Sequence, residues 1–178
     1  MNNKEKIPNN SNHDFGCSLS FLNGMLRKTT SFVQHLDTQI NILIGISLGM
    51  FAFGASKFQG ENGDISLAFL VLTIFSLLST LVGLFAIHPP KWLRKRGQEE
   101  SLMYNKKISS FSSSVEYGDE LLKAIKNKEE IVRQYATELY NISKYYYRPK
   151  RNLFHIARRI FLLGITISFI LLLKVIVS

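Results

Sequence analysis

Apolar residues gather in three long runs along the chain, and polar or charged residues dominate between them. The runs are residues 38–56, 65–87 and 160–178. A helix needs about 20 apolar residues to cross a hydrocarbon core of about 30 Å, and each run has about that length. The one charged residue within them, Lys174, is close enough to its end of the run to reach an interface. The pattern predicts an all-α integral membrane protein with three transmembrane helices.

The segments beside the first two runs are polar or mixed. Residues 1–17 are rich in Asn and poor in apolar side chains, which predicts a flexible tail. Residues 18–37 predict an amphipathic lead-in helix, and no cleaved signal peptide is expected before it. A short stretch with Gly60, Asn62 and Gly63 joins the first two runs, so these two helices are expected to form an antiparallel hairpin.

Residues 88–159 separate the second and third runs and are predicted to form a helical segment. Serines within residues 109–114 offer a cap for a short amphipathic helix, and Lys128 begins a longer one with an apolar stripe. Pro149 is expected to kink or end that longer helix. If the chain stays helical through Pro149, the segment becomes a lever joined directly to the third transmembrane helix.

The formal net charge is +9, and most of the 22 Lys and Arg lie in residues 88–159. Basic residues abut the membrane runs at residues 94–96 and at Arg158 and Arg159. Because cationic residues next to membrane helices favour the cytoplasmic side, residues 88–159 are expected in the cytoplasm. The N-terminus is then also inside, and the C-terminus is outside.

This positive charge has three possible uses. It can hold the topology and attract the anionic head groups of the lipid bilayer, or it can bind a small ligand that carries a phosphate. Binding to nucleic acid is the least favoured use, because no pattern typical of an RNA- or DNA-binding fold occurs.

Tyrosines and basic residues concentrate between residues 140 and 151. The members that would suit a nucleotide are Tyr140, Lys144, Tyr147, Arg148 and Arg151. A Lys or Arg can pair with a phosphate while an aromatic ring stacks on a base. The same composition is also typical of the interfacial belt beside a membrane helix, so both interpretations stay open.

Small and polar residues mark the first membrane run. Gly45, Ser47 and Gly49 form a small-residue pattern that could pack against the second run or against another copy of the chain. Asp37 and Asn41 lie at the inner edge of the run, where polar groups are costly unless they are paired or hydrated.

No pattern of catalytic or metal-binding residues is found. Cys17 is the single cysteine, the four histidines are scattered, and no glycine-rich phosphate loop occurs. Glu129 and Glu130 are adjacent and therefore point in different directions on a helix, which excludes them as a general acid–base pair. No enzymatic activity, cofactor or metal is expected.

Residues 30–177 resemble the Pycsar effector family of small multi-pass bacterial membrane proteins. The most specific pieces are Asp37 and Thr38 at the start of the first run, residues 138–144 (ELYNISK) with the basic stretch after them, and Ala157. The resemblance implies a bacterial antiphage defence system in which a partner pyrimidine nucleotide cyclase makes cyclic CMP or cyclic UMP. It also implies an effector that answers by impairing the inner membrane, so that infection is aborted. No recognised cyclic-nucleotide-binding domain is present, so no ligand residues carry over.

The leading hypothesis is therefore a nucleotide-responsive effector of the bacterial inner membrane. It is expected to act as a homo-oligomer, because three helices alone do not enclose a water-filled path. The alternative is a constitutive membrane scaffold or interaction protein without a nucleotide ligand. A transporter subunit is disfavoured, because the membrane runs hold almost no charged groups.

Overall fold

The computed structural model describes residues 11–60, 64–90 and 100–177. These residues are mostly helical and include no strand. Three helical stretches are long and apolar enough to cross a membrane, namely Phe15–Phe58, Leu67–Ile87 and Lys128–Val177, and each contains most or all of one predicted run. The all-α class and the three membrane-spanning helices are thus confirmed. The basic residues 94–96 lie outside the described residues.

The chain divides into two compact units, which are described separately. The bundle unit contains the described residues of 32–90 and 143–177. The head unit contains the described residues of 11–31 and 100–142.

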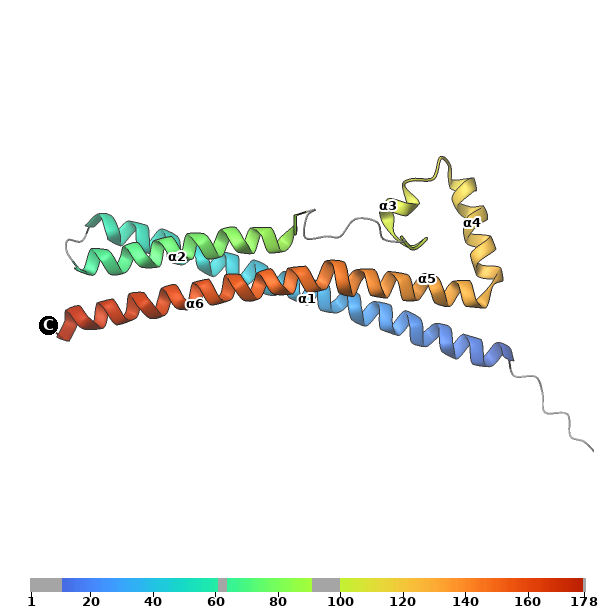
Figure 1. The fold of residues 1–178 in the computed structure, drawn as a ribbon, viewed down its shortest axis with the longest axis horizontal. Helices are drawn as coiled ribbons and strands as arrows, with labels where there is room; N and C mark the ends of the chain where they lie inside the picture. The colour runs from blue at the N-terminus through green and yellow to red at the C-terminus, as the bar shows by residue number, and fades with distance from the viewer. Residues whose placement is uncertain (1–10, 61–63, 91–99, 178) are drawn as a thin grey trace, which may run out of the picture. The chain divides into compact units, whose positions relative to one another are not determined.

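The bundle unit is built from the second part of α1 (Ser11–Gly60), from α2 (Asp64–Ile87) and from α6 (Arg148–Val177). Figure 1 shows α2 running beside α6. Gly164 on α6 permits this close approach, because a Cβ at that position would lie 2.3 Å from the Cβ of Phe75. Small residues at the contact let helix backbones approach closely, which is how membrane helices pack.

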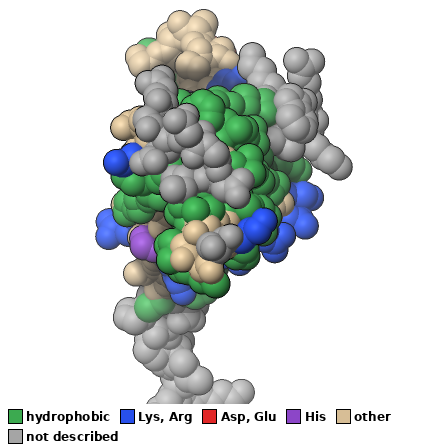
Figure 2. Space-filling model, turned by 90° about the vertical axis from the view of Figure 1, so that its left-hand side faces the viewer, with side chains coloured by type: hydrophobic (Ala, Val, Ile, Leu, Met, Phe, Trp, Pro, Cys, Tyr) green, Lys and Arg blue, Asp and Glu red, His purple; other side chains and the backbone are tan. Residues whose placement is uncertain are grey.

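Large apolar side chains cover the outside of the bundle unit. Figure 2 shows hydrophobic side chains over much of the visible face. Exposed examples come from all three helices: Ile42, Phe53, Leu84, Leu163 and Phe169. An outer surface of this kind suits lipid tails and would be unfavourable in water.

The head unit combines the first part of α1 with α3 (Asn105–Ile108), α4 (Ser114–Lys126) and α5 (Lys128–Asn141). The Ser113 hydroxyl accepts a hydrogen bond from the Glu116 amide at 3.2 Å, which confirms the predicted helix cap.

A single residue joins α4 to α5. Asn127 ends α4 and caps α5, because its side-chain oxygen accepts from the amides of Glu129 and Glu130. α5 begins at Lys128, as predicted. The chain therefore turns sharply between two helices that contact each other (Figure 1).

Two expectations about helix ends need correction. The flexible tail was expected to reach residue 17, but α1 begins at Ser11 and continues unbroken through the lead-in segment and the first run. Extending an existing helix adds one hydrogen bond per residue, whereas starting a new helix is costly, which favours the single long helix. In the predicted turn between the first two runs, Gly60 still belongs to α1 and residues 61–63 lie outside the described residues.

Pro149 does not end its helix. α5 passes into a π-helical segment at Ile142–Tyr147, and α6 follows directly at Arg148. A proline lacks the amide hydrogen and crowds the carbonyl of the preceding turn, and the wider π turn just before Pro149 accommodates both effects. Residues Lys128–Val177 thus form one helical run, as the lever hypothesis requires.

Candidate functional site

An ion pair links α1 to α6 within the bundle unit. The Lys150 ammonium donates to the Asp37 carboxylate at 2.6 Å. The Lys150 side chain is only 10% exposed, whereas that of Asp37 is 37% exposed. Asp37 was predicted to need a partner or hydration, and Lys150, which is 113 positions away in the sequence, is that partner. Asn41, the other polar residue of this region, is exposed. Because a buried ammonium without its partner is costly, this pair ties α1 to α6.

An apolar core is formed by Leu36, Ile40 and Ala86 in the same unit. Tyr147 packs against this core and is partly buried, together with Leu153. The ring of Tyr147 therefore contributes to helix packing in the bundle unit.

The predicted nucleotide-binding residues divide between the two units. Tyr140 lies on α5 in the head unit and is 52% exposed, whereas the other four residues belong to the bundle unit. Lys144, Arg148 and Arg151 are exposed along one helical run. Their side chains form a basic stretch that can meet phosphate groups from solvent or from lipid.

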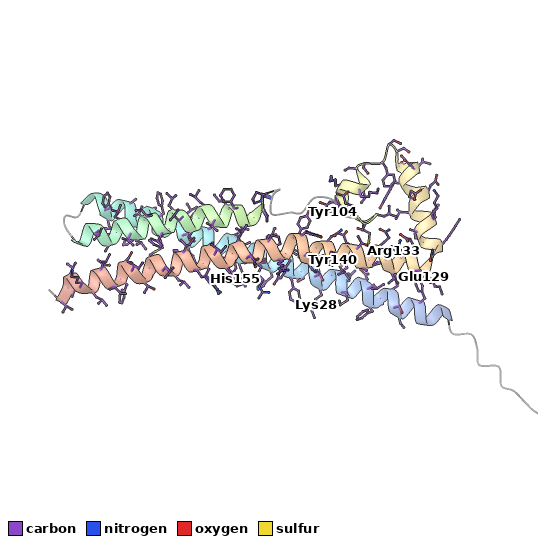
Figure 3. The ribbon with its side chains drawn as sticks, viewed as in Figure 1. Lys28, Tyr104, Glu129, Arg133, Tyr140 and His155 are labelled. Carbon is purple, nitrogen blue, oxygen red and sulfur yellow. The ribbon has the colours of Figure 1, made fainter. Side chains whose placement is uncertain are left out.

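His155 lies next to this basic stretch. Figure 3 shows it on α6, and its Nε2 lies 3.3 Å from the Arg151 Nε, with which it hydrogen-bonds. Burial lowers the pKa of His155, and the neighbouring charges of Arg158, Arg151 and Arg159 lower it further. Both effects favour the neutral imidazole, which is the form whose Nε2 can accept the hydrogen bond from Arg151.

Buried hydroxyl groups connect the three helices of the bundle unit. The Ser47 hydroxyl shares a hydrogen bond of 3.2 Å with Ser79, which donates to the Ala157 carbonyl at 3.0 Å. Among the described residues, the hydroxyls of Ser76 and Ser168 are buried and have no partner. The bundle thus holds polar groups in its interior, and two of them are unsatisfied.

The three small residues of the first run do not share a face. Ser47 is fully buried inside the bundle unit, whereas Cβ atoms at Gly45 and Gly49 would meet nothing within 4 Å. The physical reason is that positions two apart on a helix point in nearly opposite directions. The expectation of a single packing face is therefore corrected, and Gly45 and Gly49 remain open to another copy of the chain.

The head unit contains an open cavity of about 670 Å³ between α3, α4, α5 and the residues before α3. Its lining includes two ammonium groups, three carboxylates and an aromatic ring: Lys107, Lys123, Glu100, Glu120, Glu130 and Phe111. Protein sites for small ligands have volumes of about 300 to 1,000 Å³, so this cavity has the size of a ligand site.

Side chains of α4 and α5 hold one wall of the cavity in place. The Gln134 side chain accepts from the Leu102 amide at 2.7 Å and donates to Glu130 at 2.6 Å. The Tyr117 hydroxyl donates to the Leu102 carbonyl at 3.1 Å. The wall at Leu102 is thus fixed from two helices.

A residue of the ELYNISK string secures the same wall. The buried hydroxyl of Ser101 donates to the Glu138 carboxylate. Sequence reasoning missed this cavity, because its lining residues are spread over residues 100–134. The pairing of Glu138 with Ser101 has no local signal in the sequence.

The two lysines of the cavity differ in their partners. Lys123 is paired with Glu120 at 2.7 Å. The Lys107 ammonium lies 5.7 Å from the centre of the Phe111 ring, and no carboxylate of the described chain is within ion-pair distance of it. Lys107 is thus the cation best placed to receive a new anion.

Within the described part of the chain, no cluster of His, Cys, Asp or Glu could hold a metal ion. Residues 21–177 match the protein family described as the Pycsar effector protein domain. Comparisons with curated proteins and with solved structures give no match. Because the family match covers nearly the whole chain, the protein belongs to the Pycsar effector family, a family of membrane effectors of antiphage defence rather than of known enzymes.

Proposed function

We propose that the protein detects a cyclic pyrimidine mononucleotide and responds by impairing the bacterial inner membrane, so that infection is aborted. The observation that carries this proposal is the family match over residues 21–177. The family implies pairing with a cyclase and a cyclic pyrimidine signal. A membrane bundle joined to a head unit with a ligand-sized cavity is an architecture suited to this role.

The proposed topology places the head unit in the cytoplasm, where such a cyclase would release its product. Arg158 and Arg159 are exposed on α6 just before the apolar stretch that begins at residue 160. Basic residues at this position favour the cytoplasmic side of a membrane helix. The C-terminal end of α6 then lies outside.

Transmission is proposed to follow the helical run from α5 into α6. A ligand that prefers one arrangement of the head helices shifts the population toward that arrangement. The π segment Ile142–Tyr147 lies on this route, and π segments within helices are frequent at functional sites. The pair of Lys150 with Asp37 lies just beyond this segment and provides a contact that a shift of α6 would break.

Membrane damage is proposed to need several copies of the chain, because three helices do not enclose an aqueous path. Gly45 and Gly49 offer open positions for close contact with another copy. When the helices separate, the hydroxyls of Ser47, Ser76 and Ser168 become available to line such a path.

A second candidate function is that of an interaction protein with a protein partner. Exposed apolar residues on α4 favour it, because Val115, Leu122 and Ile125 are 70%, 57% and 60% exposed. A face of this kind on a soluble unit is typical of an interaction site. This function needs no nucleotide, so a direct test with purified components separates it from the first.

The test uses the purified full chain in vesicles loaded with a self-quenching dye. Cyclic CMP and cyclic UMP are added separately, with cyclic AMP as the control. The proposal predicts dye release only after a cyclic pyrimidine nucleotide is added. Release without a nucleotide would contradict nucleotide control, and no release with any of the nucleotides would contradict the proposal and favour a protein trigger.

A further inference from the structure

We infer that the cavity of the head unit is the nucleotide-binding site, with Lys107 as its phosphate contact, and that it prefers cyclic CMP to cyclic UMP. This inference rests on the proposed function, which supplies the class of ligand. It adds the location of the site and the choice of base. Both come from the side chains that line the cavity.

The phosphate position is assigned to Lys107. Lys107 is half-buried, and its ammonium lies over the Phe111 ring with no carboxylate within ion-pair distance among the residues described. The ammonium group interacts more favourably with a phosphate oxygen than with an aromatic face, because charge-assisted hydrogen bonds are among the strongest in proteins. Lys123 contributes less, because Glu120 already pairs with it.

The base position is assigned to the Phe111 ring. The centre of this ring lies 5.4 Å from that of Tyr117, whose hydroxyl is bonded to the cavity wall, so contact with Tyr117 helps to hold the ring in place. Any nucleobase can stack on an aromatic side chain, because every base has a π face. A pyrimidine that displaces the Lys107 ammonium from the ring also frees that ammonium to reach the phosphate.

The choice of base follows from the carboxylates. Three carboxylates line the cavity, and two of them are already neutralised by lysines, Glu100 by Lys106 and Glu120 by Lys123. In Glu130, the Oε1 atom accepts a hydrogen bond from Gln134, and within the described part of the chain the contact recorded for the Oε2 atom is an ion pair of 4.0 Å with Arg133. The Oε2 atom can therefore accept one more hydrogen bond.

Cytosine and uracil differ in what they would present to Glu130. Cytosine carries an exocyclic amino group, which a carboxylate accepts well. Uracil carries a carbonyl oxygen at the same position, so two acceptors would face each other and neither would be satisfied. The cavity therefore favours cyclic CMP.

The basic stretch of Lys144, Arg148 and Arg151 is the competing location. These side chains are exposed, and the phosphates of lipid head groups can occupy them as readily as a nucleotide can. The experiment therefore includes variants of both locations.

Calorimetry on the detergent-solubilised full chain measures binding of cyclic CMP, cyclic UMP and cyclic AMP. Lys107→Gln is expected to weaken binding of cyclic CMP about ten- to hundredfold, because it removes a charge-assisted contact. Phe111→Leu is expected to weaken it as well, by removing the stacking face. The matched control is Lys126→Gln, an exposed lysine of α4 that does not line the cavity, and it should bind like the wild type.

Glu130→Gln tests the choice of base. An amide can accept from cytosine or donate to uracil, so this variant should lose most of the preference for cyclic CMP. Circular dichroism and a melting curve for each variant establish that the head unit is folded. If the Phe111→Leu variant does not fold, the inference is tested with Lys107→Gln and Glu130→Gln alone.

The outcomes separate the inference from the proposed function. If the wild type binds cyclic CMP, and Arg148→Gln or Arg151→Gln abolishes binding while Lys107→Gln does not, the cavity assignment is wrong and the proposed function stands. Equal affinity of the wild type for cyclic CMP and cyclic UMP would overturn the base preference. No binding of any nucleotide would overturn the proposed function, and the inference with it.

Discussion

Different interactions stabilise the interior of each of the two units. In the bundle unit, helices approach through small side chains such as Gly164 and Ala157, and one ion pair joins α1 to α6. In the head unit, polar side chains such as Gln134 fix a stretch of non-helical backbone. Dense apolar packing resists small changes, whereas a wall held by a few hydrogen bonds can rearrange when a ligand offers better partners. This difference supports the proposal that the head unit is the part that senses the signal.

The largest expected effect comes from breaking the packing of the bundle unit. Gly164→Leu forces a side chain against Phe75, where even a Cβ would lie 2.3 Å away. Overpacking costs about 1 to 3 kcal/mol or more, and here α2 and α6 must move apart. The melting temperature in detergent should fall by several degrees or more.

Gly45→Leu is the matched control, since nothing lies within 4 Å of a Cβ at that position. It should leave the melting temperature of the monomer unchanged. If copies of the chain meet at this position, combining it with Gly49→Leu suppresses membrane toxicity while expression is maintained. Equal destabilisation by Gly164→Leu and Gly45→Leu would contradict the packing described for the bundle unit.

A smaller effect is expected from breaking the ion pair. Asp37→Ala leaves the Lys150 ammonium buried without its partner. The cost should be about 1 to 3 kcal/mol, below that of a fully buried pair because solvent reaches the Asp37 carboxylate. Chemical unfolding in detergent measures this change, and Asn41→Ala, at an exposed position one turn away, serves as the control. Equal stability of the two variants would remove the ion pair from the account.

In the head unit, Gln134→Ala should loosen the cavity wall. The Leu102 amide loses its acceptor, which costs about 1 to 2 kcal/mol. Hydrogen exchange at residues 100–104 should become faster, while exchange in α2 stays unchanged. Arg133→Ala is the control, because its side chain is 70% exposed and its nearest carboxylate contact is 4.0 Å long. Faster exchange in both variants would mean that Gln134 has no special role in the wall.

The smallest effects concern pH, and each unit has its own titrating group. The pKa of His155 is lowered by burial and by nearby arginines, so the bundle unit should lose stability as the pH falls below about 6.5, the ordinary pKa of histidine. Hydrogen bonds from Ser112 lower the pKa of Glu116. The contribution of the Glu116 carboxylate to the stability of the head unit should therefore be lost as the pH falls below about 4.5.

Melting curves recorded from pH 8 to about pH 3 test whether the two units lose stability in this order. His155→Gln should flatten the dependence near pH 6 and leave the step at lower pH in place. If His155→Gln melts with the same pH profile as the wild type, the environment assigned to His155 is wrong.

Local features of the fold were predictable from the sequence. Runs of apolar residues revealed the membrane helices, and serine before an acidic turn revealed the cap of α4, because both depend on neighbours within one helix. The start of α1 was placed too late, because the composition of a short polar segment does not show that a long helix extends into it.

The candidate sites depend on distant residues and were less accessible. Nothing near Asp37 in the sequence points to Lys150, and nothing near Phe111 points to Gln134. It could have been predicted that Ser47 faces away from Gly45 and Gly49, because helix geometry alone places Ser47 on the opposite side from the two glycines.

The central claim is that a cyclic pyrimidine nucleotide causes this chain to impair the bacterial membrane. The most direct measurement follows the membrane potential of phage-infected bacteria that carry the protein together with a pyrimidine cyclase, using a voltage-sensitive dye. The account predicts depolarisation before phage release with an active cyclase and none with a catalytically inactive one. Equal depolarisation with both cyclases, or none with the active cyclase, would contradict it.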